Sequence, residues 1–268
     1  MSSTVRHIPV TEGRSVLGGR LTLKLGAADT GEAYSFLRGH TPSGLGPPLH
    51  AHELEDETFY VLRGTYEMKC GDEHVTVGPG ACLHLPRYWP HTFRNVSDEP
   101  GELVELMTPG GLDRYFDAVS HLGPEAEDLV ARNEVGRPFG LSFFDDAGEY
   151  AGPPPGKVRR SFTVRGAGEG RTADFGAHQA TWKVEPDEAD GLHGLIEVLL
   201  DPGQSSAVPP SSQSLCVVLE GRIAVESEGV RVEAGAWDAV ALLAAGASVV
   251  GNADGRPARF LHFSIPGN

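Results

Sequence analysis

The chain has 268 residues, of which 40% are apolar and 22% are charged, and its formal net charge is −15. This acidic balance, with no cluster of Lys and Arg, argues against nucleic-acid binding, because phosphate backbones are bound by basic groups. Residues 1–10 lack the apolar core of a signal peptide, and no apolar stretch is long enough to cross a bilayer. The three cysteines have no CxxC spacing. These features predict a cytoplasmic protein with free thiols and no membrane partner.

The first hundred residues carry strand patterns that are separated by turns. With 35 Gly and 20 Pro residues, the composition suits many short strands. Apolar and polar residues alternate over 20–25, and a run rich in β-branched and aromatic residues covers 57–62. Residues 73–77 and 81–85 flank a Gly-Pro-Gly turn, and 103–107 give a further strand pattern. An all-β fold is therefore expected.

Helical patterns occur only in the middle of the chain. Residues 111–121 (GLDRYFDAVSH) place three apolar side chains at helical spacing. Residues 124–133 (PEAEDLVARN) begin with Pro and have acidic residues early and Arg132 late, as helix ends prefer. Two short helices are predicted here. Residues 152–156 (GPPPG) then predict a stiff linker.

After this linker the sequence repeats itself at an offset of 157 residues. YVLRG at 60–64 corresponds to VVLEG at 217–221, and Asn95 corresponds to Asn252. A period of this length indicates two copies of a domain and not a solenoid. The predicted division is an N-terminal domain over 1–122, a helical segment with a Pro/Gly-rich linker over 123–157, and a C-terminal domain over 158–268.

Four residues of the first copy are candidate ligands of a metal ion: His50, His52, Glu57 and His91. Three imidazoles and one carboxylate suit a borderline first-row divalent ion. His50 and His52 are two residues apart, so on a strand they point to the same face. Glu57 begins the next strand pattern, where it shares a face with apolar residues. A carboxylate buried there requires a partner, which a metal ion would supply.

The second copy lacks these ligands. At the same offset the four positions are occupied by residues that do not bind a divalent ion strongly: Ala207, Pro209, Ser214 and Ser248. The repeated framework survives without them, so the fold does not require the histidines. We therefore expect one metal ion per chain, in the N-terminal domain, and a degenerate C-terminal domain.

The spacing of these residues resembles the two motifs of the cupin superfamily. The first motif is matched by Gly44, His50, His52, Glu57 and Gly64, and the second by Gly80, Pro86, His91 and Asn95. Tyr88 stands where the second motif has its inner glycine, which requires a different backbone conformation or strain. Because both halves share the pattern, the chain resembles a bicupin, which implies two jelly-roll β-barrels in tandem with a short helical connection.

Within the cupins, residues 46–121 are similar to the quercetin 2,3-dioxygenase-like proteins. The segments PPLHAHELEDETFYVLRG, LPRYWPHTFRN and TPGGLDRYFDAVSH carry this similarity. It implies a divalent ion, whether iron, nickel, manganese, cobalt or zinc, that binds an enolisable phenolic substrate such as a flavonol or an aromatic polyketide beside dioxygen. Glu57 would also act as the general base. Aromatic walls for the substrate are expected from Phe59, Phe93, Tyr88 and Trp89.

Two other functions are compatible with the same residues. A non-oxidative isomerase, cyclase or lyase of secondary metabolism would use the same ion to stabilise an enolate. A non-catalytic ligand-binding bicupin would account for the second copy but not for the ligands of the first. The oligomeric state is also open, and a homodimer is one of the alternatives.

Overall fold

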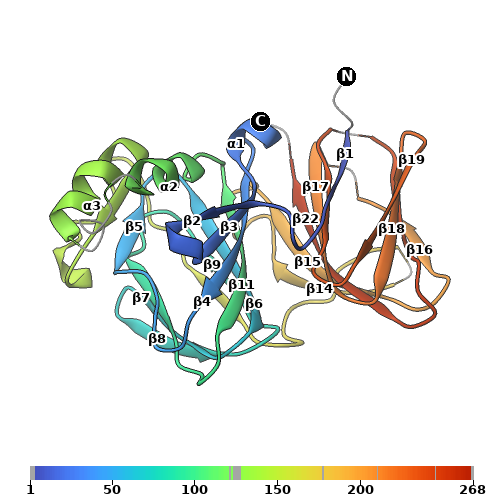
Figure 1. Ribbon diagram of the computed structural model, residues 1–268, viewed down its shortest axis with the longest axis horizontal. Helices are drawn as coiled ribbons and strands as arrows, with labels where there is room; N and C mark the ends of the chain where they lie inside the picture. Colours follow the sequence, from blue (N-terminus) through green and yellow to red (C-terminus); the bar gives the residue numbers. More distant parts are fainter. Residues whose placement is uncertain are drawn as a thin grey trace. The chain divides into compact units, whose positions relative to one another are not determined.

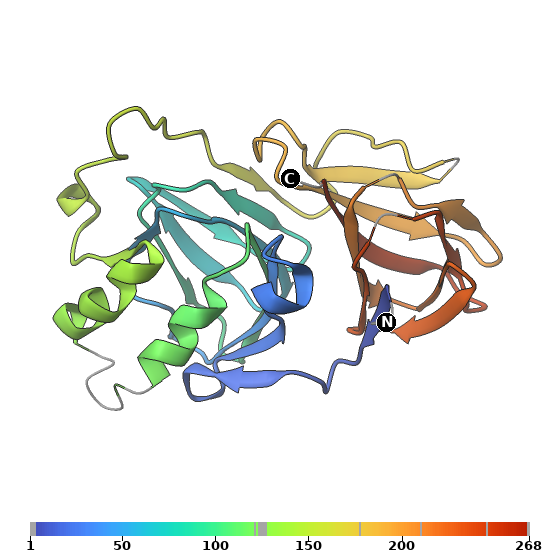
Figure 2. The same cartoon turned by 90° about the horizontal axis from the view of Figure 1, so that it is seen from above.

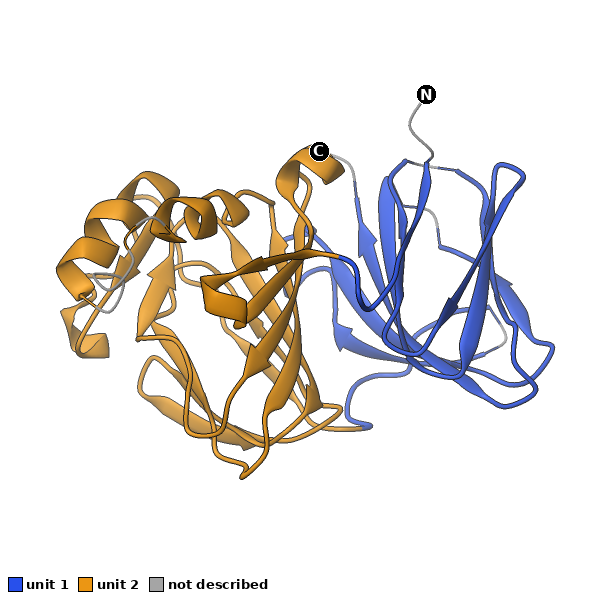
Figure 3. Ribbon diagram, in the orientation of Figure 1, with its two compact units in different colours: residues 1–12, 168–268 blue, residues 13–167 orange. Residues whose placement is uncertain are grey.

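The computed structural model describes residues 4–120, 122, 128–176, 178–209, 211–244 and 246–266. The chain forms two compact units (Figure 3). We call Gly13–Ala167 the N-terminal unit, and Met1–Glu12 with Gly168–Asn268 the C-terminal unit. Each unit contains two antiparallel sheets, which confirms the predicted all-β jelly-roll class. No helix in the described part of the chain is long and apolar enough to span a membrane.

The N-terminal unit is built from a seven-stranded and a five-stranded sheet (Figure 1). The first has the order β13-β9-β6-β11-β4-β3-β2 and the second the order β12-β5-β10-β7-β8. The strands are β2 (Arg14–Val16), β3 (Leu21–Leu25), β4 (Ser35–Thr41), β5 (His50–His52), β6 (Asp56–Arg63), β7 (Tyr66–Cys70), β8 (Glu73–Val77), β9 (Cys82–Leu85), β10 (His91–Asn95), β11 (Gly101–Thr108), β12 (Leu141–Phe143) and β13 (Thr163–Arg165).

Side-chain alternation decides which face of these strands lies inside. In β7, Tyr66, Met68 and Cys70 are buried, whereas Glu67 between them is exposed. β6 differs, because its first six residues are all buried. It lies between β9 and β11 near the middle of the larger sheet, where both faces are covered. A carboxylate in such a strand cannot reach bulk water, whichever way it points.

Short helices follow β11 and lie side by side at one end of the unit (Figures 1 and 2). The first predicted helix is found as α2 (Asp113–Ser120). The second is found as α3 (Leu129–Gly136), which begins later than expected and continues further. Asp128 caps α3, because its carboxylate accepts the N–H groups of Val130 and Ala131 at 2.8 and 3.0 Å. Residues 121 and 124–127 of the predicted helices lie outside the described part of the chain.

The remaining helical turns of the N-terminal unit are short. They are α1 (Ala27–Thr30) and the 3-10 turns η1 (Leu17–Gly19), η3 (Arg137–Phe139) and η4 (Ala147–Glu149). After η3 the chain enters β12, which pairs with β5 so that Phe143 lies opposite His50 and Leu141 opposite His52. The segment between the two predicted domains therefore contributes a strand directly beside two candidate ligands.

The C-terminal unit repeats the arrangement with a six-stranded sheet, β1-β20-β17-β22-β15-β14, and a four-stranded sheet, β16-β21-β18-β19. An apolar core of aliphatic and aromatic side chains lies between them, including Val198, Val225 and Phe260. Its strands are β1 (Val5–Ile8), β14 (Gln179–Val184), β15 (Gly194–Leu200), β16 (Ser205–Ala207), β17 (Gln213–Glu220), β18 (Arg222–Ser227), β19 (Val230–Gly235), β20 (Ala239–Leu242), β21 (Ser248–Asn252) and β22 (Ala258–Ile265).

The bounds of the units differ from the division expected from the repeat. β1, at the start of the chain, pairs with β20 of the C-terminal unit. β13, which follows the GPPPG segment, pairs with β9 of the N-terminal unit. Residues 152–156 form no helix or strand, as expected. The boundary between the units, however, falls later in the sequence, after Ala167. The repeat locates the matching strands, whereas edge pairing of the flanking segments sets the bounds.

The two units share one strand register, as the repeat predicts. Several cross-strand pairs of the N-terminal unit have a counterpart in which both partners are shifted by 157 residues. Glu57 pairs with Leu85 as Ser214 pairs with Leu242. Glu57 also pairs with Met107 as Ser214 pairs with Ser264. His91 pairs with Cys70 as Ser248 pairs with Ser227.

Candidate metal centre

Three strands bring the four candidate ligands to one place. His50 and His52 come from β5, Glu57 from β6, and His91 from the start of β10. β5 and β10 are neighbours in the smaller sheet, where His50 pairs with His91, and β6 belongs to the larger sheet. One ligand atom from each of the four side chains lies within 4.8 Å of the others, and all four residues are buried. The four residues form a candidate metal site.

Backbone carbonyl groups orient two of the imidazoles. Nδ1 of His50 lies 2.8 Å from the carbonyl oxygen of Pro48, and Nδ1 of His91 lies 2.8 Å from that of Trp89. A carbonyl oxygen only accepts, so each Nδ1 carries the hydrogen and donates it. In a neutral ring the lone pair is then on Nε2. Nε2 of His50 is thus able to ligate a cation, whereas Nε2 of His91 contacts Oε2 of Glu57 and would exchange this contact for a cation. Ligating histidines are commonly held in this way.

The centre fits a divalent ion. Nε2 of His91 lies 2.9 Å and Nε2 of His52 lies 3.6 Å from Oε2 of Glu57. Both ring nitrogens of His52 are buried, and neither has a hydrogen-bond partner among the residues that the structure describes. Metal–ligand bonds of about 2 Å place two ligands of one ion at most about 4 Å apart. These two separations lie within that limit, and the ligand atoms as a group, all within 4.8 Å of one another, exceed it only slightly.

The electrostatics of the four side chains favour the ligating forms of His50 and Glu57. Burial, together with His91 and His52, lowers the pKa of His50 well below its usual value. Burial alone would raise the pKa of Glu57, but the hydrogen bond with His91 and the charge of His52 lower it. Burial would also lower the pKa of His52, yet the carboxylates of Glu55 and Glu57 raise it. A cation binding here would therefore compete with a proton on His52.

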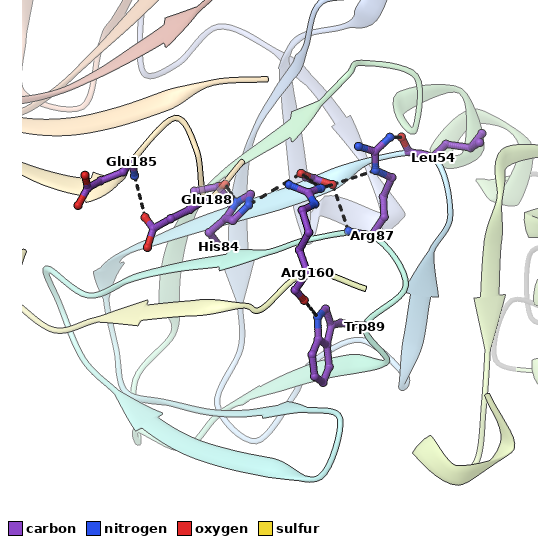
Figure 4. Close-up of polar contacts among 9 residues, drawn as sticks. Leu54, His84, Arg87, Trp89, Arg160, Glu185 and Glu188 are labelled. Carbon is purple, nitrogen blue, oxygen red and sulfur yellow. Dashed lines mark hydrogen bonds and ion pairs between the residues drawn. The ribbon is translucent and has the colours of Figure 1, made fainter. Parts of the chain in front are cut away.

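A buried ion-pair network fixes the strand that carries Glu57. Asp56, which is 0% exposed, accepts hydrogen bonds from Arg160 at 2.7 Å and from Nε of Arg87 at 3.0 Å (Figure 4). Its Oδ1 also accepts the backbone N–H of Arg87 at 3.1 Å. Arg160 follows the GPPPG segment, so a distant part of the chain holds the start of β6. Such a buried carboxylate is stable only with its partners.

His84 adds to this network from β9. It is fully buried. Its Nδ1 lies 2.9 Å from Oγ1 of Thr58, and its Nε2 lies 3.8 Å from Asp56. Asp56 and Thr58 lie on the face of β6 opposite to Glu57. His84 therefore supports β6 from behind and does not reach the candidate metal centre.

A cavity of about 480 Å³ opens onto the centre. Its walls include His50, His52 and Glu57, and the volume is in the range of small-molecule sites. Phe59 and Phe93 line it, as expected, and their rings pack edge to face. The residues that border the cavity thus combine metal-ligating groups with aromatic surface.

Tyr88 and Trp89 are not among the residues that the structure places along this cavity, in contrast to the expectation. The indole N–H of Trp89 donates to the carbonyl of Arg160, and its ring packs edge to face on Phe162. Tyr88 has a φ of 72°, the left-handed conformation that the glycine of the motif would adopt freely. This turn directs the loop before His91 toward the segment around Arg160.

Polar side chains in the cavity wall that were not identified from the sequence include Glu105, Tyr115 and Arg132. Glu105 is a single charge in the apolar strand pattern LVELM, a signal that could have been used. Arg132 is buried, and its guanidinium lies 5.6 Å from the centre of the Phe143 ring. It reaches the cavity from α3, which no sequence pattern places there.

In the C-terminal unit, hydrogen bonds between protein groups occupy the equivalent positions. Oγ of Ser214, at the position of Glu57, lies 3.2 Å from Nε2 of His262. Oγ of Ser248, at the position of His91, donates to Oγ of Ser227 at 2.8 Å. Among the described residues, the four side chains of the N-terminal unit form the one cluster with metal-ligand spacing.

Comparison with known proteins gives one domain family and several relatives. Residues 36–107 match the family model described as Cupin domain. Quercetin 2,3-dioxygenase from Bacillus subtilis is 28% identical over 107 residues, which cover 39% of this chain and 32% of that protein. An uncharacterized protein from Methanocaldococcus jannaschii is 27% identical over 79 residues, 30% of this chain and 63% of its own length. The match spans less than two thirds of either relative.

Solved structures match almost the whole chain. A variant of oxalate decarboxylase from Bacillus subtilis has a TM-score of 0.67 at 15% identity, covering 99% of this chain and 78% of its own. Protein Ylba from E. coli has a TM-score of 0.65 at 10% identity, covering 97% and 89%. At these identities the likeness concerns the fold. Taken with the two jelly-roll units, it gives the chain a bicupin fold, in which residues 36–107 match the cupin domain.

Proposed function

We propose that this bicupin is a metal-dependent dioxygenase that acts on an enolisable phenolic small molecule in the N-terminal unit. The observation that carries the proposal is the cluster of three imidazoles and one carboxylate, of which His50, His52 and Glu57 line a cavity of about 480 Å³. The partial similarity to quercetin 2,3-dioxygenase supports the reaction type. The substrate would be a flavonol-like compound or an aromatic polyketide.

The chain would hold one divalent ion, with His50, His52, Glu57 and His91 as its ligands. Iron, nickel, manganese, cobalt and zinc all accept this set of nitrogen and oxygen donors. When bound, the ion would supply Lewis acidity to a substrate oxygen and orient the substrate beside dioxygen. The matching residues of the C-terminal unit do not provide such a set.

Glu57 would accept the proton of the substrate hydroxyl. Its neighbours His91 and His52 lower its pKa, so it is present as the carboxylate that this role requires. A general base must lie within hydrogen-bond reach of the proton that it removes. Glu57 lines the cavity and therefore faces the space that a substrate would occupy.

The apolar walls would exclude water and accept an aromatic ring. Phe59, Phe93, Leu112 and Phe143 border the cavity together with the candidate ligands. Aromatic and aliphatic surface of this kind binds a planar ring by burial of apolar area. Exclusion of water also protects a reactive intermediate from hydrolysis.

Oxygen uptake by the purified protein tests this proposal. Metal content is measured first, and oxygen consumption is then followed with a panel of flavonols and aromatic polyketides. We expect uptake that requires both the substrate and an intact set of ligands. Glu57→Ala should abolish it, whereas Ser214→Ala, at the same position of the C-terminal unit, should not.

The other outcomes separate the alternatives. Conversion of a substrate without oxygen uptake would replace the proposal by a non-oxidative isomerase, cyclase or lyase. Tight binding of these compounds without any conversion would favour a ligand-binding role. A protein that holds less than about 0.1 ion per chain as isolated would contradict a metal-dependent enzyme, since a preformed four-ligand site retains its ion.

A further inference from the structure

A buried carboxyl group in the cavity wall is not used by the function proposed above. Glu105 lies in β11 and is 3% exposed. Its Oε1 has no hydrogen-bond partner among the residues that the structure describes. Glu105 borders the same cavity as His50, His52 and Glu57. A buried polar atom that lacks a partner and lies at a cavity wall is placed to bind a ligand.

The position of Glu105 relative to Glu57 follows from strand register. Glu105 pairs with Phe59 across β11 and β6, and Glu57 pairs with Met107. The two carboxyl-bearing residues are therefore diagonal neighbours, about 7–8 Å apart along the sheet, with side chains on one face. A molecule at the candidate metal centre would therefore hydrogen-bond Glu105 only through a second polar group, separate from the group that binds the ion.

The neighbouring strand leaves room for this carboxyl group. Gly39 lies within β4, opposite Leu103 and beside Glu105. A Cβ atom at position 39 would lie 2.3 Å from Oε1 of Glu105, so no other residue fits without moving it. Glycine weakens the interior of a strand, and it is favoured there where another group approaches closely. Gly39 thus serves as a cradle for the Glu105 carboxyl.

In the C-terminal unit, other side chains occupy the positions of Glu105 and Gly39. His262 replaces Glu105 at the offset of 157, and it is hydrogen-bonded to Ser214. Val198 takes the place of Gly39, since it lies opposite Phe260, the counterpart of Leu103. Val198 is fully buried in the apolar core of that unit. Where there is no candidate metal centre, neither the cradle nor the unpartnered carboxyl is present.

The surroundings of Glu105 favour its neutral form. Burial raises its pKa well above the usual value, and the negative charge of Glu57 raises it further. A protonated carboxyl group has both a donor and an acceptor. It is therefore able to bind a hydroxyl or a carbonyl oxygen without placing a second negative charge beside Glu57.

We propose that Glu105 is a substrate-binding residue, whose carboxyl group hydrogen-bonds a second oxygen of the molecule bound at the metal centre. The cavity would thereby bind aromatic compounds that carry a further oxygen substituent more tightly than compounds whose only oxygens bind the ion. This inference deepens the proposed function and depends on its metal centre. It adds a specificity residue that the matching position of the C-terminal unit lacks.

Equilibrium binding of two flavonols tests this inference. Quercetin and 3-hydroxyflavone share one hydroxyketone group that chelates metals, but only quercetin has further hydroxyl groups. Dissociation constants are measured by absorbance titration of the metal-loaded protein without oxygen, so that no turnover occurs. Glu105→Met preserves the volume of the side chain and removes the hydrogen bond. We expect it to weaken quercetin binding about tenfold and to change 3-hydroxyflavone binding less than about twofold.

Three further variants guard against a structural effect. Glu105→Gln keeps a donor and an acceptor, so it should bind quercetin nearly as the wild type does. Gly39→Ala displaces the carboxyl without removing it, and it should lose the preference for quercetin as Glu105→Met does. His262→Met changes the counterpart in the C-terminal unit and should leave both constants unchanged. Metal content and thermal midpoint are measured for each variant.

The outcomes separate this inference from the proposed function. If Glu105→Met retains its metal and weakens both flavonols equally, or weakens neither, Glu105 does not select the substrate and the inference is wrong. If the metal-loaded wild type binds neither flavonol, the substrate class is wrong in both proposals. If the wild type binds no metal, the proposed function fails together with the inference that depends on it.

Discussion

The N-terminal and C-terminal units share a strand register but differ in what fills their interiors. In the N-terminal unit, His50, His52 and Glu57 line a cavity of about 480 Å³, and His91 lies beside them. In the C-terminal unit, an apolar core occupies the space between the sheets. The comparison indicates that the jelly-roll framework forms without the ligands, and that the candidate metal centre depends on a few interior positions of one unit.

The difference also affects how polar groups are satisfied. In the C-terminal unit, the two serines at ligand positions bond to other protein groups, namely His262 and Ser227. In the N-terminal unit, the ring nitrogens of His52 and one oxygen of Glu105 have no such partner among the described residues. Buried polar atoms without a partner are costly. At the matching positions of the C-terminal unit, Pro209 and His262, no such atom occurs among the described residues, as expected if only the N-terminal unit binds a ligand.

Metal content offers the largest expected contrast between the units. His52→Ala and His91→Ala should each lower the content from about one ion per chain to below about 0.1, because the remaining donors no longer form a four-ligand site. Ser248→Ala, at the position of His91, should leave it unchanged. Elemental analysis of the freshly purified variants checks this, with circular dichroism to establish that they fold. Full retention of metal in the histidine variants would contradict the assignment of the ligands.

The ion-pair network behind β6 should contribute more stability than its counterpart. Asp56→Asn leaves Arg160 and Arg87 without their buried carboxylate, and it should lower the free energy of unfolding by about 3 kcal/mol. Gln213 occupies the same position in the C-terminal unit, and Gln213→Ala should cost less than about 1 kcal/mol. Urea denaturation followed by tryptophan fluorescence measures both. Equal losses would show that the network has no special role.

Packing of the C-terminal interior is tested at the counterpart of Gly39. Val198→Ala removes two buried methyl groups from a filled core and should cost about 2 kcal/mol. Leu112 borders the cavity of the N-terminal unit, so its surroundings are already open on one side. In the same measurement, Leu112→Ala should therefore lower the free energy of unfolding by about 2–3 kcal/mol, the low end of the range for a buried leucine. A loss of about 5 kcal/mol at Leu112 would argue against an open interior.

The smallest expected effect concerns the N-terminal strand of the C-terminal unit. Asp238 accepts the N–H groups of Val10 and Gly235 at 2.8 and 3.1 Å, and its counterpart at the offset of 157 is Ala81. Burial opposes ionisation of Asp238, but these hydrogen bonds and His7 lower its pKa below the usual 3.8. Asp238→Asn should therefore cost about 1 kcal/mol at neutral pH, a value that allows for its partial exposure.

The pH dependence of that difference follows from the sign of the pKa shift. A carboxyl group whose pKa is lowered by folding stabilises the protein above its unfolded value, and the contribution is lost as the pH falls through the folded value. The gap between wild type and Asp238→Asn should thus be constant from pH 7 to about pH 5 and narrow below pH 3.8. Urea denaturation at a series of pH values checks this. A gap that widens in acid would contradict the predicted shift.

Much of this arrangement could be predicted from local patterns. The residue spacing of the two motifs indicated the jelly-roll class, the duplication, and the four residues that the structure brings together at the candidate metal centre. These features depend on strand periodicity and on the chemistry of the donor groups, both of which can be read along the chain.

The remaining features depend on contacts between distant segments. β1 and β13 pair with strands far away in the sequence, and no local signal specifies an edge partner. Arg132 reaches the cavity because α3 is placed beside it, and Trp89 turns away because Arg160 accepts its indole N–H. Aromatic residues next to a motif were therefore an insufficient guide to the wall of the cavity.

The most direct test of the central claim is to locate the ion. Crystals of the protein as purified would be examined by diffraction at the absorption edge of the metal that elemental analysis identifies. We predict one anomalous peak per chain, surrounded by His50, His52, Glu57 and His91, and none within the C-terminal unit. A peak elsewhere, or none in protein that contains metal, would contradict the assignment of the metal centre to the N-terminal unit.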